Sequence, residues 1–162
     1  MDISVRAGSR SDLKFLRLML YEAAYWQPEE RPPVDMALAN PELSKLLSGW
    51  GRQGDLALIA EDRPISVGAV WIRYWTDEDH SYGFVAADVP ELSIGIVKLY
   101  RHLGIGRLLL TRLLKDIALK IPQVSLSVEA TNPALGLYRS MGFKVVDKVA
   151  NSFTMVMNTS DA

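Results

Sequence analysis

The sequence contains no cysteine among its 162 residues. Disulfide bonds, thiolate metal ligands and a cysteine nucleophile are therefore all excluded. Histidine is nearly as scarce, with two residues, His80 and His102. A zinc site built on several histidines does not fit so small a number, and we expect no metal site.

The chain also has no large net charge and no long apolar run. The chain has 18 basic and 19 acidic side chains and a net charge of −1, so no overall field attracts nucleic acid or an anionic membrane. The first six residues lack the basic segment and apolar run of a signal peptide, and no apolar run is long enough to span a bilayer. We expect a cytoplasmic protein that binds neither nucleic acid nor membrane.

What is present is typical of one globular domain. Hydrophobic residues make up 49% of the chain and charged residues 23%, the balance of an ordinary globular protein. A chain of this length buries roughly two-thirds of its unfolded surface and leaves little room for a second domain. We expect a single domain over residues 1–162, and leave open whether it forms a homodimer.

Apolar periodicity and turn residues predict the order of strands and helices. Strands are expected over residues 3–7, 55–61, 65–75, 92–97, 124–128, 144–149 and 152–157. Helices are expected over residues 13–26, 34–50 with an interruption at Asn40-Pro41, 104–120 and 133–141. Ser9 and Asp12 have the spacing of a capping box before the first helix, and the polar stretch 76–90 is expected to be a loop. This order predicts a mixed α/β domain.

The most informative segment runs from Ile94 to Arg107 and contains the pattern R-x-x-G-x-G between a strand and a helix. Glycines let the backbone approach a phosphate closely, and the amides and dipole of a first helical turn favour an anion. Arg101 and Arg107 add positive charge. The segment therefore predicts a phosphate-binding loop.

Three ligands compete for this loop. A Walker phosphate loop requires Gly-Lys-Ser or Gly-Lys-Thr, which is absent. A dinucleotide fingerprint needs a third glycine where Leu109 stands and a strand that ends directly at the first glycine, although Glu129 could bind the ribose. The third candidate is the pyrophosphate of coenzyme A.

Two motifs carry a resemblance to a known family. The segment Arg101 to Gly106 resembles the motif Q/R-x-x-G-x-G/A of the GNAT N-acetyltransferases, with His102-Leu103 where Gly-Lys or similar residues are common. Downstream, Asn132 to Phe143 is similar to the family segment N-x-x-A-x-x-x-Y-x-x-x-G-F. It is one residue shorter between the asparagine and the tyrosine, and it keeps the spacing from Tyr138 to Gly142-Phe143. The resemblance implies the GNAT acyl-CoA N-acyltransferase fold. In this fold a central, mostly antiparallel sheet is splayed between its fourth and fifth strands and flanked by helices.

The resemblance also implies that acetyl-CoA is the co-substrate and that no metal takes part. In this family pantetheine pairs with the backbone of the fourth strand, and the Ile94 amide would polarise the thioester carbonyl. Asn132 is expected both to contact the coenzyme and to cap the helix that follows it. The implied coenzyme-binding residues are Ile94, Gly95, Ile96, Val97, Arg101, His102, Leu103, Gly104, Ile105, Gly106, Arg107, Asn132 and Tyr138.

Two residues are candidates for catalysis of direct acetyl transfer in a ternary complex. Glu91, at the start of the fourth strand, is the candidate base acting through water; Ser93 stands where some relatives carry an acid, and a solvated strand-end charge is the alternative. Tyr138 resembles the family tyrosine that protonates the departing thiolate, with helix packing as the alternative.

The acceptor is not determined by the sequence. Six aromatic side chains could bind apolar groups or cations, or belong to the core. They are Tyr21, Tyr25, Trp26, Trp71, Tyr74 and Trp75. The acidic run 77–79 could attract a polyamine, an aminoglycoside or a basic peptide, or be a solvated loop. The expected activity is N-acetylation of a primary amine on a small molecule or peptide; a non-catalytic acyl-CoA-binding or sensor domain is the alternative.

Overall fold

The structure is a computed structural model that describes residues 1–162, with Glu30 described without its side chain. It contains two compact units, Met1–Ile72 with Ser93–Leu110 and Arg73–Leu92 with Thr111–Ala162. The border between them falls within strand β4 (Glu91–Ile96) and within helix α4 (Ile105–Ile117). These two elements are therefore shared by both units.

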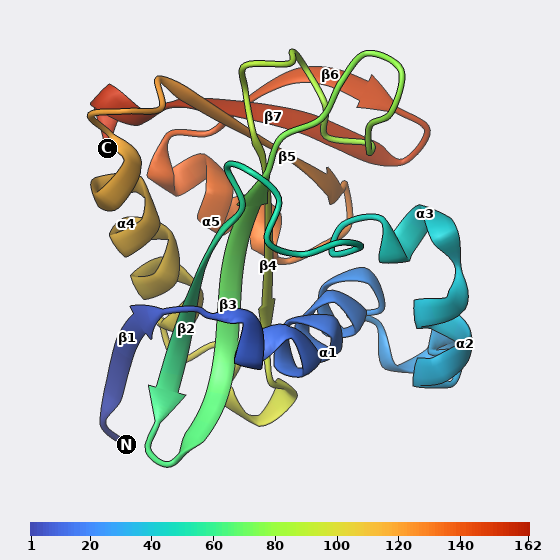
Figure 1. Ribbon diagram of the computed structural model, residues 1–162, viewed down its shortest axis with the longest axis vertical. Coiled ribbons are helices and arrows are strands. Elements are labelled where there is room, and N and C mark those ends of the chain that lie inside the picture. Colours follow the sequence, from blue (N-terminus) through green and yellow to red (C-terminus); the bar gives the residue numbers. More distant parts are fainter. The chain divides into compact units, whose positions relative to one another are not determined.

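The first unit contains strands β1, β2 and β3, most of β4, helices α1, α2 and α3 and the first turns of α4; its strand order is β1-β2-β3-β4 (Figure 1). Strand β1 is antiparallel to β2, with Val5 opposite Ala60, and β2 forms a hairpin with β3, with Leu58 opposite Val70. The bounds are β1 Ile3–Ala7, α1 Leu13–Ala24, α2 Val34–Ala39, α3 Pro41–Ser44, β2 Leu56–Asp62 and β3 Ile65–Arg73.

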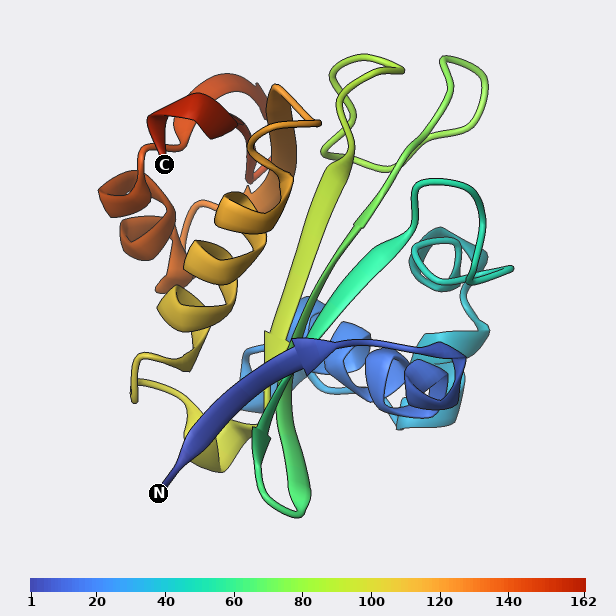
Figure 2. The same ribbon diagram turned by 60° about the vertical axis from the view of Figure 1, so that its left-hand side comes forward.

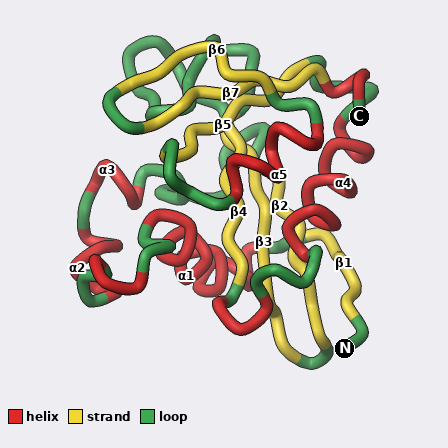
Figure 3. The backbone as a smooth tube through the Cα atoms, turned by 180° about the vertical axis from the view of Figure 1, so that it is seen from behind, coloured by secondary structure: helices red, strands yellow, loops and turns green.

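The second unit is built on β5, β7 and β6, which run side by side (Figure 3). Strand β7 is antiparallel to both of its neighbours. Strands β4 and β5 are parallel, and among the described residues their pairing is confined to Glu91 opposite Ser125. The bounds are β5 Gln123–Glu129, α5 Ala134–Met141, β6 Lys144–Val149 and β7 Ser152–Asn158, with four short 3-10 helices, η1 Arg10–Asp12, η2 Pro28–Glu30, η3 Lys98–Tyr100 and η4 Thr159–Asp161. The complete order is β1-β2-β3-β4-β5-β7-β6.

The hairpin of β2 and β3 is buried on both faces. Successive side chains of a strand point to opposite faces, and Ile59 and Trp71 belong to the face that packs on α1. On the opposite face, Gly68 lies against Leu109 in the first turns of α4. Helices therefore cover both faces, which explains why these strands read as nearly continuous apolar runs.

Most of the expected elements are confirmed. The helix expected over 34–50 is interrupted as predicted: α2 ends at Ala39, and Asn40 accepts a hydrogen bond from the Glu42 amide at 3.0 Å as the cap of α3. Figure 2 shows the expected loop 76–90, in light green, between β3 and β4. One detail was wrong. The apolar periodicity predicts one buried face of α4 with Leu108, Leu109, Leu113 and Ile117; the last three are buried, but Leu108 is 42% exposed, and Leu110 and Leu114 are buried as well.

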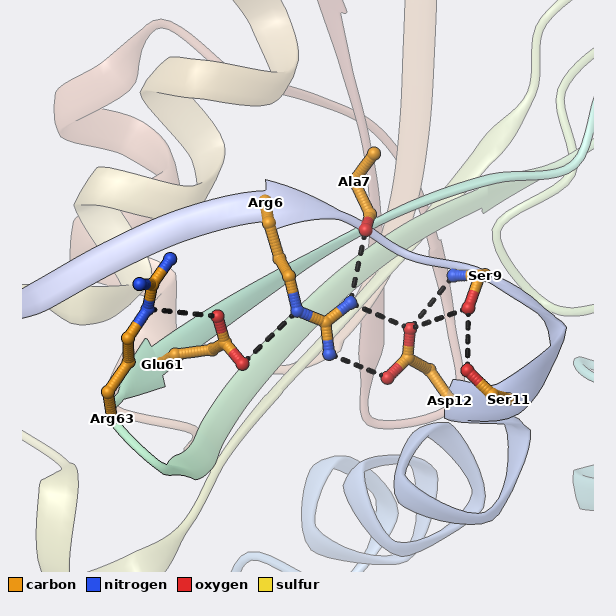
Figure 4. Close-up of polar contacts among 7 residues, drawn as sticks. All are labelled: Arg6, Ala7, Ser9, Ser11, Asp12, Glu61 and Arg63. Carbon is orange, nitrogen blue, oxygen red and sulfur yellow. Dashed lines mark hydrogen bonds and ion pairs between the residues drawn. The ribbon is translucent and has the colours of Figure 1, made fainter.

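An ion-pair network joins β1 to the start of α1 (Figure 4). The Arg6 guanidinium donates to both carboxylate oxygens of Asp12, at 2.8 and 2.9 Å, and lies 3.2 Å from Glu61. Asp12 also accepts from the Ser9 amide at 2.8 Å, which forms its half of the predicted capping box. These contacts, the Arg6 hydrogen bond above all, lower the pKa of Asp12 from 3.8 to about 2.

We expect the Asp12 contacts to stabilise the protein above about pH 4 and to be lost as the pH falls towards 2. The reason is that protonation of Asp12 in the unfolded state precedes protonation in the folded state. Asp12→Asn should lower the free energy of unfolding by on the order of 2 kcal/mol at pH 6 and by much less at pH 2. Urea unfolding at both pH values measures this. Asp77→Asn, in the exposed loop, is the control with no effect; an equal loss for Asp12→Asn at both pH values would contradict the prediction.

Candidate active site

The predicted phosphate loop begins where β4 ends (Figure 3). Strand β4 is followed by η3, by the loop 101–104 and by helix α4. Gly95 is buried, while Ile94, Ile96 and Val97 are half-buried. The Val97 amide donates to the Val67 carbonyl at 2.9 Å, so this amide is already used between strands.

The backbone of the loop turns sharply before α4. His102 and Gly104 both have left-handed backbone, with φ of 64° and 86°. An added Cβ at Gly104 would meet nothing within 4 Å, so it is the backbone conformation that favours glycine here. No pattern in the sequence indicated the left-handed conformation of His102, which is uncommon for a residue with a side chain.

The first turn of α4 presents main-chain donors. The Gly104 carbonyl accepts from the Leu108 amide at 3.1 Å, and the amides of a first helical turn have no partner within the helix. His102, Leu103 and Arg107 are exposed around this turn. Main-chain donors at the positive end of a 13-residue helix form a site that suits a phosphate group.

Gly95 has a packing role that the sequence did not indicate. A Cβ built on Gly95 would lie 2.2 Å from the Met19 carbonyl oxygen. The backbone of α1 therefore lies directly against β4, and no side chain fits between them. The absence of a side chain at Gly95 is required by α1, whatever ligand the strand binds.

Arg101 makes three contacts within the protein. Its Nη2 donates to Glu22 at 2.9 Å, its Nε to the Ile96 carbonyl at 3.2 Å and its Nη1 to the Trp26 carbonyl at 3.5 Å. The side chain is 23% exposed. The positive charge that we expected at a phosphate is thus neutralised by a carboxylate of α1.

A second contact holds the same segment. The Tyr100 hydroxyl donates to Asp62 at 2.9 Å, at the tip of the β2–β3 hairpin. This hydrogen bond raises the pKa of Tyr100. Sequence reasoning missed this contact because the two residues are far apart in the chain and neither belongs to a motif.

Glu91 is buried, with 5% of its surface exposed. Its Oε2 accepts a hydrogen bond from the Gly83 amide at 3.2 Å. The alternative that we considered, a solvated charge at a strand end, is therefore wrong. A buried carboxylate is costly unless it is hydrogen-bonded. The loop before β4 supplies such a hydrogen bond through the Gly83 amide.

Gly83, which the sequence analysis missed, is the residue that lets this loop cover Glu91. A Cβ at Gly83 would lie 2.7 Å from Glu91 Oε2 and 2.9 Å from the main chain of Leu126 in β5. The neighbouring Tyr82 carbonyl accepts from the Thr154 hydroxyl at 3.4 Å. The loop is thus fixed to β5 and β7; a single glycine in a polar loop was the only signal for it in the sequence.

Asn132 and Tyr138 lie before and within α5. The Asn132 side chain accepts from the Ala134 amide at 2.9 Å, which confirms the predicted capping contact. Tyr138 is 7% exposed, its ring meets Phe143 edge-on at 5.8 Å, and burial raises its pKa. Gly142 ends the helix in the left-handed conformation, with φ of 110°, as expected.

The predicted site residues thus fall into two groups. Residues 94–107 belong to the first unit, and Glu91, Asn132 and Tyr138 belong to the second.

Of the candidate acceptor aromatics, Trp71 and Trp75 are buried at 0% and 4% exposure and belong to the core, whereas the acidic run 77–79 is exposed. Among the described side chains, no group of three or more His, Asp or Glu could hold a metal ion, and no helix is both long and apolar enough to cross a bilayer.

Comparison with known proteins identifies the family and the fold. Residues 53–145 match the model of the acetyltransferase (GNAT) domain. The structure is similar to that of the PaiA N-acetyltransferase from Thermoplasma acidophilum in complex with coenzyme A, with 24% identity, coverage of 98% of this chain and 99% of the other, and a TM-score of 0.74. No match was found among curated proteins.

Two further solved structures share the fold. The ribosomal-protein-alanine N-acetyltransferase from Brucella melitensis is 23% identical over 96% of this chain and 99% of its own, with a TM-score of 0.66. A chimera of the spermidine N-acetyltransferase SpeG from Vibrio cholerae and hSSAT is 21% identical over 99% and 97%, with a TM-score of 0.63.

The contact between α1 and β4 gives a test of the role of Gly95. Gly95→Ala should lower the free energy of unfolding by about 3 kcal/mol, because the methyl group overlaps a main-chain atom that cannot rotate away. Gly136→Ala is the matched control: nothing lies within 4 Å of the added Cβ, and removing a helical glycine should stabilise by on the order of 0.5 kcal/mol. Urea unfolding at pH 7 compares the two, and an unchanged midpoint for Gly95→Ala would show that α1 does not lie against the strand.

Proposed function

Since the chain belongs to the GNAT acetyltransferase family, we propose that it transfers the acetyl group of acetyl-CoA directly to a primary amine of a small molecule or peptide. Residues 1–162 act as one cytoplasmic N-acetyltransferase domain in this proposal. The observation that carries it is the loop 101–104, whose backbone, left-handed at His102 and Gly104, leads into the main-chain donors of the first turn of α4. Such donors suit a pyrophosphate and do not depend on a particular side chain.

The coenzyme-binding role falls to two segments of the chain. The amides of Ile105, Gly106 and Arg107, with the exposed side chains of His102 and Arg107, bind the pyrophosphate, and the Ile94 amide hydrogen-bonds the thioester carbonyl. Asn132 adds a contact from the start of α5. When bound, acetyl-CoA supplies an acetyl group that is activated as a thioester.

Glu91 serves as the base in this proposal. An amine attacks a thioester only in its neutral form, so the acceptor ammonium must first lose a proton. Glu91 accepts that proton through a water molecule, and the Gly83 amide holds its carboxylate in place while the loop keeps it out of bulk solvent. Gly83 is thus a positioning residue for the base.

Tyr138 serves as the acid. The new C–N bond forms as the C–S bond breaks, and the sulfur leaves with the electron pair of that bond. The Tyr138 hydroxyl donates a hydrogen bond and then its proton to this sulfur, and the proton that the acetylated nitrogen loses restores the Tyr138 hydroxyl. Because burial raises its pKa, Tyr138 keeps its proton throughout the neutral range and is present in the form that can donate.

The acceptor is proposed as a class only. Two relatives of the same fold are named for amine substrates, one for a ribosomal-protein alanine and one for spermidine. A primary amine is common to both, and the exposed acidic run 77–79 suits a positively charged acceptor. We therefore propose a cationic amine, small or peptide-borne, as the substrate of this protein.

Thermal unfolding with added ligands tests the donor. Acetyl-CoA at a hundred times its dissociation constant should stabilise the folded state by about 2.7 kcal/mol, which raises the melting temperature of a chain of this size by about 5 to 10 °C. NADH and ATP at the same concentrations are the controls and should have little effect. A shift with NADH or ATP alone, or none with acetyl-CoA, would refute the assignment of the loop.

Tyr138→Phe tests catalysis separately from binding. The hydroxyl makes no hydrogen bond among the described contacts, so its removal should leave the fold unchanged, and the loss of one hydrogen bond to the sulfur should weaken coenzyme A binding by no more than about tenfold. Loss of the acid should lower kcat by about 100-fold or more. Release of free thiol from acetyl-CoA with a panel of amines measures the rate, and calorimetric titration measures the affinity. Full activity in Tyr138→Phe would remove the acid from the mechanism, and a wild-type protein that binds coenzyme A but acetylates no amine would favour the non-catalytic alternative.

A further inference from the structure

The three contacts of Arg101 join separate segments of the first unit. Its Nε binds the Ile96 carbonyl at the end of β4, its Nη1 faces the Trp26 carbonyl just after α1, and its Nη2 pairs with Glu22 in the last turns of α1. One guanidinium therefore ties the end of the strand and the start of the phosphate loop to a helix that lies about 80 residues earlier in the sequence.

Glu22 is itself held by a second arginine. Its Oε1 accepts from Arg31 Nη2 at 2.7 Å, while its Oε2 accepts from Arg101. Arg31 also lies over the Tyr21 ring at 4.7 Å, and the Tyr21 hydroxyl donates to the Pro32 carbonyl at 2.6 Å. Both oxygens of Glu22 are used, and its side chain is 19% exposed, so the carboxylate has little freedom to leave Arg101.

The position of Glu22 follows from the packing of α1. Met19, whose carbonyl lies against Gly95, precedes Glu22 by three residues, and residues three apart lie on the same side of a helix. The helix that touches β4 at Gly95 thus brings Glu22 towards the segment that follows β4. Arg101 meets it there.

We propose that Arg101 is a positioning residue, and that its pair with Glu22 fixes the phosphate loop in the conformation that binds the coenzyme. This inference rests on the proposed function. The main-chain donors of α4 and the exposed residues His102 and Arg107 bind the anion, and Arg101 holds the loop that carries them. The alternative is that Arg101 is a direct phosphate ligand, for which Glu22 is a competing anion.

The two roles predict different effects of Glu22→Gln on the affinity for the coenzyme. If Arg101 positions the loop, Glu22→Gln weakens coenzyme binding, because the loop loses its anchor. If Arg101 binds phosphate directly, Glu22→Gln leaves the affinity unchanged or strengthens it, because a carboxylate near the anion is removed and the guanidinium is released. Arg101→Gln weakens binding in both cases and does not discriminate alone.

The experiment is calorimetric titration of coenzyme A into the wild type, Glu22→Gln, Arg101→Gln and the double variant. We expect each single variant to raise Kd about tenfold, which corresponds to about 1.4 kcal/mol, and the double variant to be no weaker than Arg101→Gln, since one interaction is lost only once. Arg112→Gln is the matched control, because it removes an equal charge from an exposed pair with Asp116 on α4, and its Kd should stay within about twofold.

The affinities, the kinetic constants and the melting temperature separate the outcomes. If the wild type binds no coenzyme A, the proposed function fails; if it binds and Glu22→Gln binds as well or better, the positioning role fails. Arg31→Gln, which leaves the Arg101 pair in place, is the milder second variant should Glu22→Gln unfold, and positioning predicts a smaller rise in Kd for it. With an active amine, Glu22→Gln should raise KM for acetyl-CoA and leave kcat unchanged, whereas general destabilisation would lower both the melting temperature and kcat.

Discussion

The Met19 carbonyl approaches Gly95 so closely that no side chain fits between α1 and β4. The rest of the first unit depends on this contact. It sets the distance between the helix and the strand, and it places Glu22 of α1 where Arg101 can reach it after the strand ends. In the role proposed for Arg101, the same contact helps to fix the loop 101–104, which begins six positions after Gly95.

Several charged side chains of this protein hold segments together. Arg6 joins β1 to Asp12, and Arg31 and Arg101 share the carboxylate of Glu22. Because these pairs are only partly exposed, water screens them less than it screens surface pairs. In the proposed function, the affinity for an anion then depends on main-chain donors, whose positions are fixed by the helix and need no free charge. A net charge close to zero is compatible with such a site.

In the second unit, a carboxylate is kept buried. Glu91 has little exposed surface, and the Gly83 amide supplies a hydrogen bond to it. The loop can come this close only because Gly83 has no side chain. Glycines at positions 83 and 95 therefore act in the same way in the two units: each lets a main chain pass next to a group that the proposed reaction needs.

Features that depend on neighbouring residues could be predicted from the sequence. Periodicity and backbone preferences, which act over a few residues, specify the order of helices and strands, the break at Asn40-Pro41, the cap at Asn132 and the left-handed end of α5 at Gly142. The motif from Arg101 to Gly106 was readable for the same reason. The folded chain was needed to show that Glu91 is buried, that Gly95 touches α1 and that the partner of Arg101 is Glu22. These features depend on how separate segments pack, and no local pattern specifies which group of another segment a side chain will meet.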